Sequence, residues 1–203
     1  MTIFQGAGSE VQTTLQEKAD LLPSHLGGHL DKTHNDRGAL RYLIEELDIK
    51  SFLDIGCGPG GMIKLANWRG LKAVGIDGDW LVEKERDVTI LIHDFNDGPP
   101  KLDETFDLAW SVEFLEHVDE QYQDNYMQAF VRCKYAVVTH ATMVGKGHHH
   151  VNCKPAEYWI KVFDKYGFDY DDALTQKVRA ASSMQKPFMQ KTGLFFERRK
   201  SSE

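Results

Sequence analysis

Hydrophobic residues recur along this chain with two different spacings. Leu40, Leu43, Ile44 and Leu47 recur at intervals of three and four, which places them on one face of a helix at residues 38–47. Elsewhere the apolar residues form short continuous runs, as is typical of strands buried on both faces. Five such runs predict strands at residues 51–55, 73–76, 88–92, 106–110 and 135–139.

Helical patterns lie between and after these strands. Helices are expected at residues 62–69, 120–132, 156–166 and 174–184. Two further short strands are expected at residues 168–170 and 193–197. Strands that alternate with helices predict the α/β class, with a mostly parallel sheet of seven strands and helices on both of its faces.

The length of the chain, 203 residues, favours a single domain over residues 1–203, because one core of this size can be buried without division. Residues 1–37 are polar and contain the pair Gly27–Gly28, so an N-terminal helix and loop are expected there. They would cap a core formed by residues 38–203. A helical insertion at about residues 171–190 precedes the last strand, and both variable segments are expected to close over a site.

The charge balance narrows the classes of partner. A formal net charge of -7 and a pI near 5.7 give no general attraction to nucleic acids or anionic membranes. No apolar run has the length of a membrane span, and residues 1–10 lack the pattern of a secretory signal. The 3 scattered cysteines indicate reduced thiols rather than a disulfide framework. These features predict a cytoplasmic protein and disfavour nucleic acid as its partner; they leave the oligomeric state undetermined.

A cluster of glycines follows the first predicted strand, at a turn where the backbone can come close to a ligand. Read as Gly56-x-Gly58-x-x-Gly61, it satisfies the dinucleotide fingerprint, and Asp77 lies where a ribose-binding carboxylate belongs. Asp54 argues against a dinucleotide, because a carboxylate at the strand end would repel a pyrophosphate and would suit a cationic ligand. The charge therefore favours S-adenosylmethionine over NAD.

The segment Asp54-x-Gly56-x-Gly58-x-Gly60 resembles the first motif of class I methyltransferases. Residues 106–118 are similar to the fourth strand and following turn of small-molecule members of that family, and the resemblance is dense over residues 50–140. It implies a Rossmann-like sheet whose last strand is antiparallel. It also implies S-adenosylmethionine as cofactor and S-adenosylhomocysteine as product.

The same resemblance implies which residues bind the cofactor. Asp77 matches the acid that accepts hydrogen bonds from the ribose hydroxyls, and Asp94 matches the acid that contacts the exocyclic amine of adenine. Trp80 is expected to cover the adenine face, and Phe95 to offer its backbone N–H. The complete expected set is Asp54, Gly56, Cys57, Gly58, Gly60, Asp77, Gly78, Trp80, Asp94, Phe95 and Ser111.

Histidines supply the candidates for a general base, which is needed only if the acceptor is a hydroxyl or a protonated amine. His117 follows the fourth strand, at the edge of the sheet where such folds bind ligands, and is the leading candidate. His140 follows the fifth strand and points to the same edge. His149 and His150 match a family position that approaches the substrate. The predicted catalytic residues are therefore His117, His149 and His150.

No metal site is predicted from the run His148–His150, because three adjacent histidines cannot all face one ion from a regular strand. The spacing of this run to Cys153 is not diagnostic of zinc either. Cys57 is not expected to be a nucleophile, because it lies inside the cofactor loop. Arg179, Lys186 and Lys191 are interpreted as part of a solvated helix face, with binding of an anionic acceptor as the alternative.

The turn after the fourth strand favours a small acceptor. It reads Trp110-Ser111-Val112-Glu113 and lacks the Asn-Pro-Pro-Tyr or Asp-Pro-Pro-Tyr motif of amino-methylating nucleic-acid enzymes in this family. With the acidic charge, this predicts methyl transfer by in-line displacement to a small-molecule or glycan-type acceptor with an oxygen or nitrogen nucleophile. Two alternatives remain, namely an S-adenosylmethionine-binding sensor or scaffold without turnover, and an NAD-binding oxidoreductase.

Overall fold

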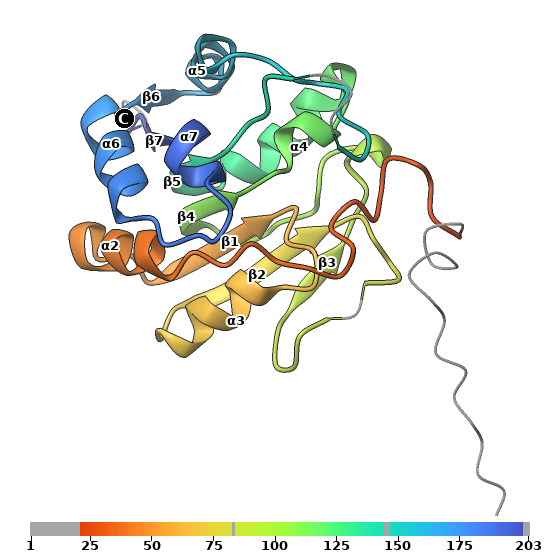
Figure 1. The fold of residues 1–203 in the computed structure, drawn as a ribbon, viewed down its shortest axis with the longest axis horizontal. Helices are drawn as coiled ribbons and strands as arrows, with labels where there is room; N and C mark the ends of the chain where they lie inside the picture. Colours follow the sequence, from red (N-terminus) through yellow and green to blue (C-terminus); the bar gives the residue numbers. More distant parts are fainter. Residues whose placement is uncertain (1–20, 83, 144–146, 201–203) are drawn as a thin grey trace, which may run out of the picture.

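The computed structural model describes residues 21–82, 84–143 and 147–200, which form one seven-stranded sheet with helices on both faces (Figure 1). The strands are β1 (Ser51–Ile55), β2 (Lys72–Asp77), β3 (Ile90–Ile92), β4 (Phe106–Ser111), β5 (Cys133–Val138), β6 (Phe168–Tyr170) and β7 (Leu194–Arg198). Their order is β3-β2-β1-β4-β5-β7-β6, and β7 runs antiparallel to both β5 and β6. The predicted class, the strand count and the antiparallel last strand are confirmed.

The helices divide between the two faces of the sheet. They are α2 (Arg37–Leu47), α3 (Gly61–Trp68), α4 (Gln123–Phe130), α5 (Ala156–Lys165), α6 (Asp172–Ala181) and α7 (Phe188–Thr192). Buried residues of α2, α3, α6 and α7 share one hydrophobic cluster, and those of α4 and α5 share another. This is the two-layered cover that parallel strands buried on both faces require (Figure 1).

Strand β7 contributes side chains to both hydrophobic clusters. Leu194 and Phe196 belong to the cluster under α4 and α5, whereas Phe195 belongs to the cluster under α2 and α6. Successive side chains of a strand point to opposite faces, so a continuous apolar run buries all of them. Each of these side chains is at most 2% exposed, and burial of one such side chain contributes about 1.5–3 kcal/mol.

Asp36 fixes the start of α2 against the C-terminal part of the chain. Its carboxylate accepts hydrogen bonds from the backbone N–H of Ala39 at 3.0 Å and of Ser183 at 2.8 Å, and a further one from the hydroxyl of Ser182. The side chain is fully buried. A helix-capping carboxylate is therefore shared between α2 and the segment that follows α6.

The structure differs from the sequence expectation at a few boundaries. The predicted helix at residues 120–132 begins as a 3-10 turn, Glu120–Tyr122, and continues as α4. The short helix α7 was not predicted, because a single turn around buried Met189 is too short to show helical spacing. The expectation of an N-terminal helix and loop over residues 1–37 lies partly outside the described residues, which begin at residue 21. Among the described residues, no helix is long and apolar enough to cross a membrane.

Candidate functional site

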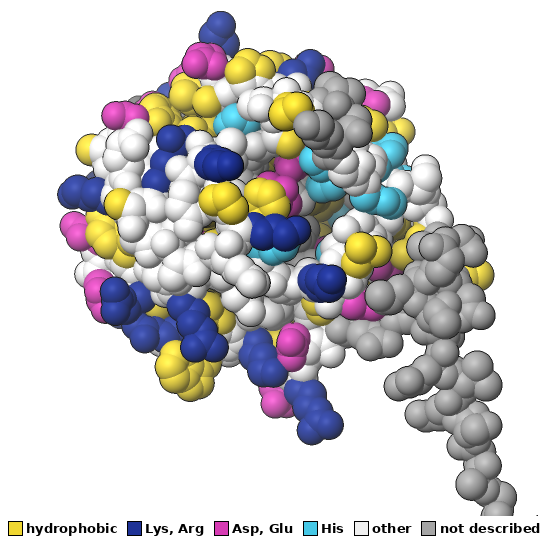
Figure 2. Space-filling view, viewed as in Figure 1, with side chains coloured by type: hydrophobic (Ala, Val, Ile, Leu, Met, Phe, Trp, Pro, Cys, Tyr) yellow, Lys and Arg dark blue, Asp and Glu magenta, His cyan; other side chains and the backbone are white. Residues whose placement is uncertain are grey.

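A cavity of about 810 Å³ lies at the carboxyl ends of the parallel strands, lined by the segments that follow β1, β2, β3, β4 and β5. The strand order reverses between β1 and β4, and ligands of open α/β sheets bind at such a reversal. Figure 2 shows histidine side chains gathered beside the hollow on this face. The cavity is therefore the candidate site.

The glycine loop after β1 forms one wall of the cavity, through Gly56, Cys57 and Gly58. Gly56 has φ of 74°, and a Cβ there would lie 2.4 Å from the ring of Phe114, so no other residue fits without displacement. The N–H of Gly58 donates to the Asp77 carboxylate at 2.7 Å. Gly60 forms the N-cap of α3 and does not line the cavity.

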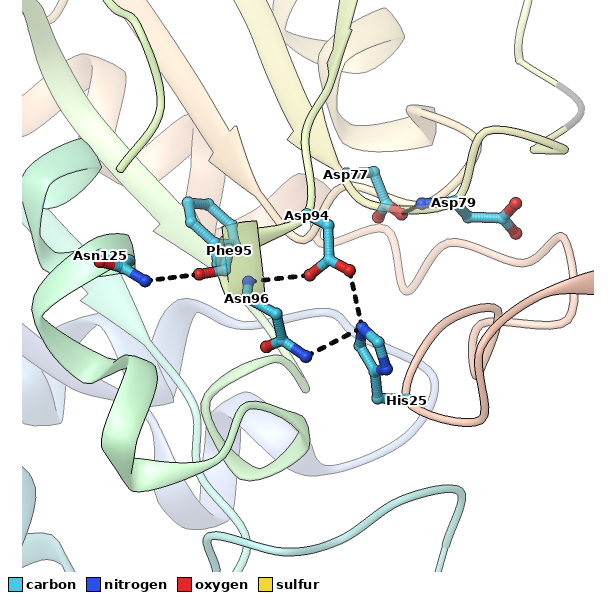
Figure 3. A network of polar contacts seen from close by, with 7 residues as sticks. All are labelled: His25, Asp77, Asp79, Asp94, Phe95, Asn96 and Asn125. Atoms are coloured by element: carbon cyan, nitrogen blue, oxygen red, sulfur yellow. Dashed lines mark hydrogen bonds and ion pairs between the residues drawn. The ribbon is translucent and has the colours of Figure 1, made fainter. Parts of the chain in front are cut away.

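Two of the three predicted acids line the cavity. Asp77, at the end of β2, is 8% exposed and accepts from the N–H groups of Gly58 and Asp79, at 2.7 and 2.9 Å. Burial raises the pKa of Asp77, and the nearby His29 and these two donors oppose that rise. Asp94, after β3, accepts from the N–H of Asn96 at 2.9 Å. Figure 3 shows Asp77 and Asp94 on neighbouring turns.

Asp54 has a different environment from the one that its charge suggested. Its side chain is 3% exposed and does not line the cavity. Burial, and secondarily the charge of Asp77, hold the pKa of Asp54 well above its ordinary range. The acidity at the cavity wall therefore comes from Asp77 and Asp94, and the charge argument from Asp54 is weaker in the folded chain.

An N-terminal segment, residues 25–34, lies across the cavity and reaches the acids. His25 Nε2 lies 2.7 Å from the Asp94 carboxylate and 3.1 Å from the side-chain nitrogen of Asn96 (Figure 3). His29 Nε2 lies 3.1 Å from the Asp79 carboxylate. Burial lowers the pKa of His29, but Asp79, Asp77 and Asp31 outweigh it, so the net shift is upward.

The sequence pattern predicts this segment only as part of a cap over residues 1–37. Two signals were available in it: the pair Gly27–Gly28, which marks a turn, and the histidines around that pair. Neither signal identifies the partners, since His25 and Asp94 are 69 residues apart in the chain. The contact is a product of the tertiary fold.

The remaining expected cofactor residues divide between the cavity and the core. Gly78 lines the cavity, and so does Phe95, whose side chain is 4% exposed and packs in the core. Ser111 is fully buried and its hydroxyl donates to the carbonyl of Ile55 at 2.9 Å, which ties β4 to β1. Trp80 is 51% exposed and does not line the cavity. The structure thus does not bring Ser111 or Trp80 to the site.

His117 and His150 meet at the lining of the same cavity. Their rings are 4.8 Å apart and nearly perpendicular, and both line the cavity. Burial, followed by the charge of His150, lowers the pKa of His117 to about 4, so this imidazole is neutral near neutral pH. His140 also lines the cavity, and burial lowers its pKa. His149 does not line it.

Two lysines from the C-terminal insertion lie beside the same cavity. Lys186 and Lys191 are exposed, as a solvated helix face requires, and they also belong to the lining of the cavity. The nearby Arg179 instead donates to the carbonyl of Gly193 at 2.7 Å. Cys57 is 3% exposed, and burial raises the pKa of its thiol well above the ordinary value, as suits a packed rather than a nucleophilic cysteine.

Comparison with known proteins gives one family match. A family model described as a methyltransferase domain matches residues 31–134, just over half of the chain. No curated protein matches the sequence. A TehB-like S-adenosylmethionine-dependent methyltransferase from Corynebacterium glutamicum has a similar structure, with a TM-score of 0.57 and 19% identity over 81% of this chain and 90% of that chain.

Two similar structures contain S-adenosylhomocysteine. The 1,6-didemethyltoxoflavin-N1-methyltransferase of Burkholderia thailandensis has a TM-score of 0.58 and 13% identity over 81% of this chain and 78% of that chain. Magnesium protoporphyrin IX methyltransferase from Synechocystis PCC 6803 has a TM-score of 0.53 and 15% identity over 94% and 90%, respectively. At these identities the likeness establishes a shared fold.

Proposed function

Because the chain belongs to the family of S-adenosylmethionine-dependent methyltransferases, we propose that it transfers a methyl group from this cofactor to a small-molecule acceptor. The observation that carries the proposal is one cavity that is lined both by the glycine loop with Asp77 and Asp94 and by the pair His117 and His150. We refer to the first group as the glycine-lined end, which suits the cofactor, and to the second as the acceptor end, which suits an acceptor. The family match also favours S-adenosylmethionine over the NAD alternative.

The residues at the glycine-lined end fit an adenosine-containing cation. Gly56 and Gly58 leave the wall free of side chains, and the carboxylates of Asp77 and Asp94 lie at the same wall. Carboxylates accept hydrogen bonds from ribose hydroxyls and from an exocyclic amine. Asp77 would therefore hold the ribose, and Asp94 the adenine. The volume of about 810 Å³ is in the range of sites that enclose a ligand of this size.

Methyl transfer demands positioning more than covalent chemistry. The cofactor supplies a methyl group on a sulfonium, which is already activated toward displacement. The chain must therefore hold a nucleophile in line with that methyl group and exclude water. Residues 25–34 and the insertion around Lys186 both contribute to the cavity lining, so they are the segments that would exclude water.

The acceptor that would bind at the acceptor end is a small or glycan-type molecule with an oxygen or nitrogen nucleophile. His117 and His150 are the imidazoles that would contact it or accept its proton. His117 is neutral near neutral pH, but a pKa of about 4 makes it a weak base. His149 lies outside the cavity lining, so we do not assign it a role there. The similar proteins named for toxoflavin and porphyrin methylation support a small acceptor.

The test of this proposal is calorimetric titration with S-adenosylhomocysteine. Asp94→Asn is expected to weaken binding by about tenfold or more, because a hydrogen bond to a charged group is worth roughly 1.5–3 kcal/mol. Asp97→Asn is the matched control, since Asp97 is exposed, lies three residues away and does not line the cavity. Absence of binding to the wild-type chain would refute the proposal.

A turnover assay distinguishes an enzyme from a sensor or scaffold that binds the cofactor without transferring its methyl group. Incubation of the chain with S-adenosylmethionine and a fractionated metabolite extract is expected to release S-adenosylhomocysteine from particular fractions. Mass spectrometry of those fractions would then show a product heavier by one methyl group. Tight cofactor binding without turnover in any fraction would favour the sensor or scaffold.

A further inference from the structure

Glu116 is a fully buried carboxyl group, in the 3-10 turn Leu115–His117 that follows β4. No hydrogen-bond donor among the described residues reaches either oxygen of its side chain. Burial and the neighbouring Glu113 carboxyl hold its pKa well above the ordinary value. A buried carboxylate without a partner is costly, so this group requires a proton or a cation beside it.

Two imidazoles lie next to this carboxyl group. The ligand atoms of Glu116, His117 and His150 all lie within 4.8 Å of one another. The chain fixes this arrangement, because the backbone N–H groups of Val151 and Asn152 both donate to the Glu116 carbonyl at 3.0 Å. His150 is thereby held against the turn that carries the other two residues.

The two rings offer nitrogen atoms to the same point as the carboxyl group. The backbone of His148 favours a proton on the His117 imidazole and partly opposes the effect of burial on its pKa. Histidine ligands of metals are commonly oriented by a hydrogen bond from the ring nitrogen that does not bind the ion. The Nδ1 atom of His150 has no hydrogen-bond partner among the described residues. Second to burial, the neighbouring Glu113 carboxyl raises the pKa of Glu116, and it accepts from the Thr139 hydroxyl at 3.4 Å, so it is not counted among the ligands.

We propose that Glu116, His117 and His150 bind a divalent transition-metal cation, such as Mn²⁺ or Zn²⁺, at the acceptor end of the cavity. Two imidazoles with a carboxylate favour such ions over Mg²⁺ or Ca²⁺, which prefer oxygen ligands. A metal-bound set of this kind spans about 3–4 Å between ligand atoms at ordinary bond lengths of roughly 2.0–2.2 Å. The observed set therefore closes around an ion with small side-chain shifts.

The position of the site specifies the class of acceptor, an inference that rests on the proposed methyl transfer. Glu113, His117 and His150 line the cavity, so an ion held there has an open side toward the acceptor. A hydroxyl oxygen on that side would be oriented, and its pKa lowered. Its proton leaves to solvent, the O–CH₃ bond forms as the C–S bond breaks, and no group is oxidised or reduced. The acceptor is then an oxygen nucleophile.

Metal binding is tested on the tag-free, chelator-treated chain by calorimetric titration with Mn²⁺ alone. One ion per chain is expected. Glu116→Gln, His117→Asn and His150→Asn should each weaken binding by at least about tenfold. His149→Asn is the matched control, because His149 is adjacent but outside the set, and asparagine tolerates its φ of 46°. The Mn²⁺ affinity of His149→Asn should stay within about twofold of the wild-type value.

A thermal melt with and without Mn²⁺ checks that the variants fold. The ion should raise the Tm of the wild-type chain and of His149→Asn, but not of Glu116→Gln, since a ligand stabilises only the state that binds it. No binding by the wild-type chain, or binding unaffected by all three substitutions, would overturn the metal site. S-adenosylhomocysteine titrated in the presence of chelator tests the proposed function separately, so the two failures are distinguishable.

Discussion

Two separate effects disfavour any side chain at Gly56 in the cofactor loop. Its φ is 74°, and a Cβ at this position would lie 2.4 Å from the Phe114 ring. Gly56→Ala is expected to lower the free energy of unfolding by about 2–4 kcal/mol, of which backbone strain is roughly 1–2. It should also weaken S-adenosylhomocysteine binding, because the loop must shift. Urea unfolding and calorimetry measure the two effects.

Gly70→Ala is the control that measures the cost of backbone strain without a steric collision. Gly70 has a similar φ of 86°, but a Cβ there would have nothing within 4 Å. This variant should lose only the cost of strain, about 1–2 kcal/mol, and should keep the affinity of the wild-type chain. Equal losses of stability in both variants would show that Phe114 does not constrain the loop.

Single residues differ in how far the sequence could predict them. Asp77 and Asp94 were predictable, because Asp77 ends a strand and Asp94 follows one, and the parallel sheet fixes where the carboxyl ends of these strands lie. Glu116 and His150 were not seen as a pair, since hydrogen bonds within the folded chain bring them together. Trp80 was expected at the adenine face and is instead half exposed, away from the cavity lining. Its place in the sequence motif did not determine where its side chain points.

Among the elements, the segment at residues 25–34 is the one whose position should depend on pH. The pKa of His29 is raised in the folded chain, so the ion pair with Asp79 stabilises this segment fully below the ordinary histidine pKa of about 6.5. The contribution is lost as the pH rises through the raised value. Trypsin should therefore cleave His29→Gln after Lys32 several times faster than the wild-type chain at pH 6. By pH 8.5 the two rates should converge.

His34→Gln is the control for this experiment. His34 belongs to the same segment, but its ring packs edge-on against Phe188, with ring centroids 5.0 Å apart. Burial lowers its pKa, so it contributes in the opposite direction and should not reproduce the effect at pH 6. A constant rate ratio between His29→Gln and wild type across this pH range would contradict the role of His29.

The elements were predicted with uneven success for a physical reason. Strands such as β1 and β6 were located within a residue or less, because a continuous apolar run has few other stable placements in a parallel sheet. Residues 25–34 have no apolar periodicity, and their position depends on Asp79 and Asp94. Sequence alone predicted that this segment would cover a site, but not which groups it would contact.

At the scale of the whole molecule, Asp36 connects two segments that line the cavity. Residues 25–34 end just before it, and Ser182 and Ser183, which bind its carboxylate, precede the lysine-bearing part of the insertion. Both walls therefore depend on one fully buried group. Because the bonds join positions near opposite ends of the chain, Asp36 is expected to affect the stability of the entire fold rather than of α2 alone.

Asp36→Ala is therefore expected to lower the free energy of unfolding by about 2–4 kcal/mol, since the buried N–H of Ala39 and the part-buried N–H of Ser183 lose their acceptor. Asp171→Ala is the matched comparison. Asp171 caps α6 by accepting from the N–H of Leu174 at 2.8 Å, but it is only partly buried, so its loss should cost about 0.5–2 kcal/mol. Urea unfolding with an unchanged m-value measures both. Equal costs would show that Asp36 acts as an ordinary helix cap and does not join the two cavity walls.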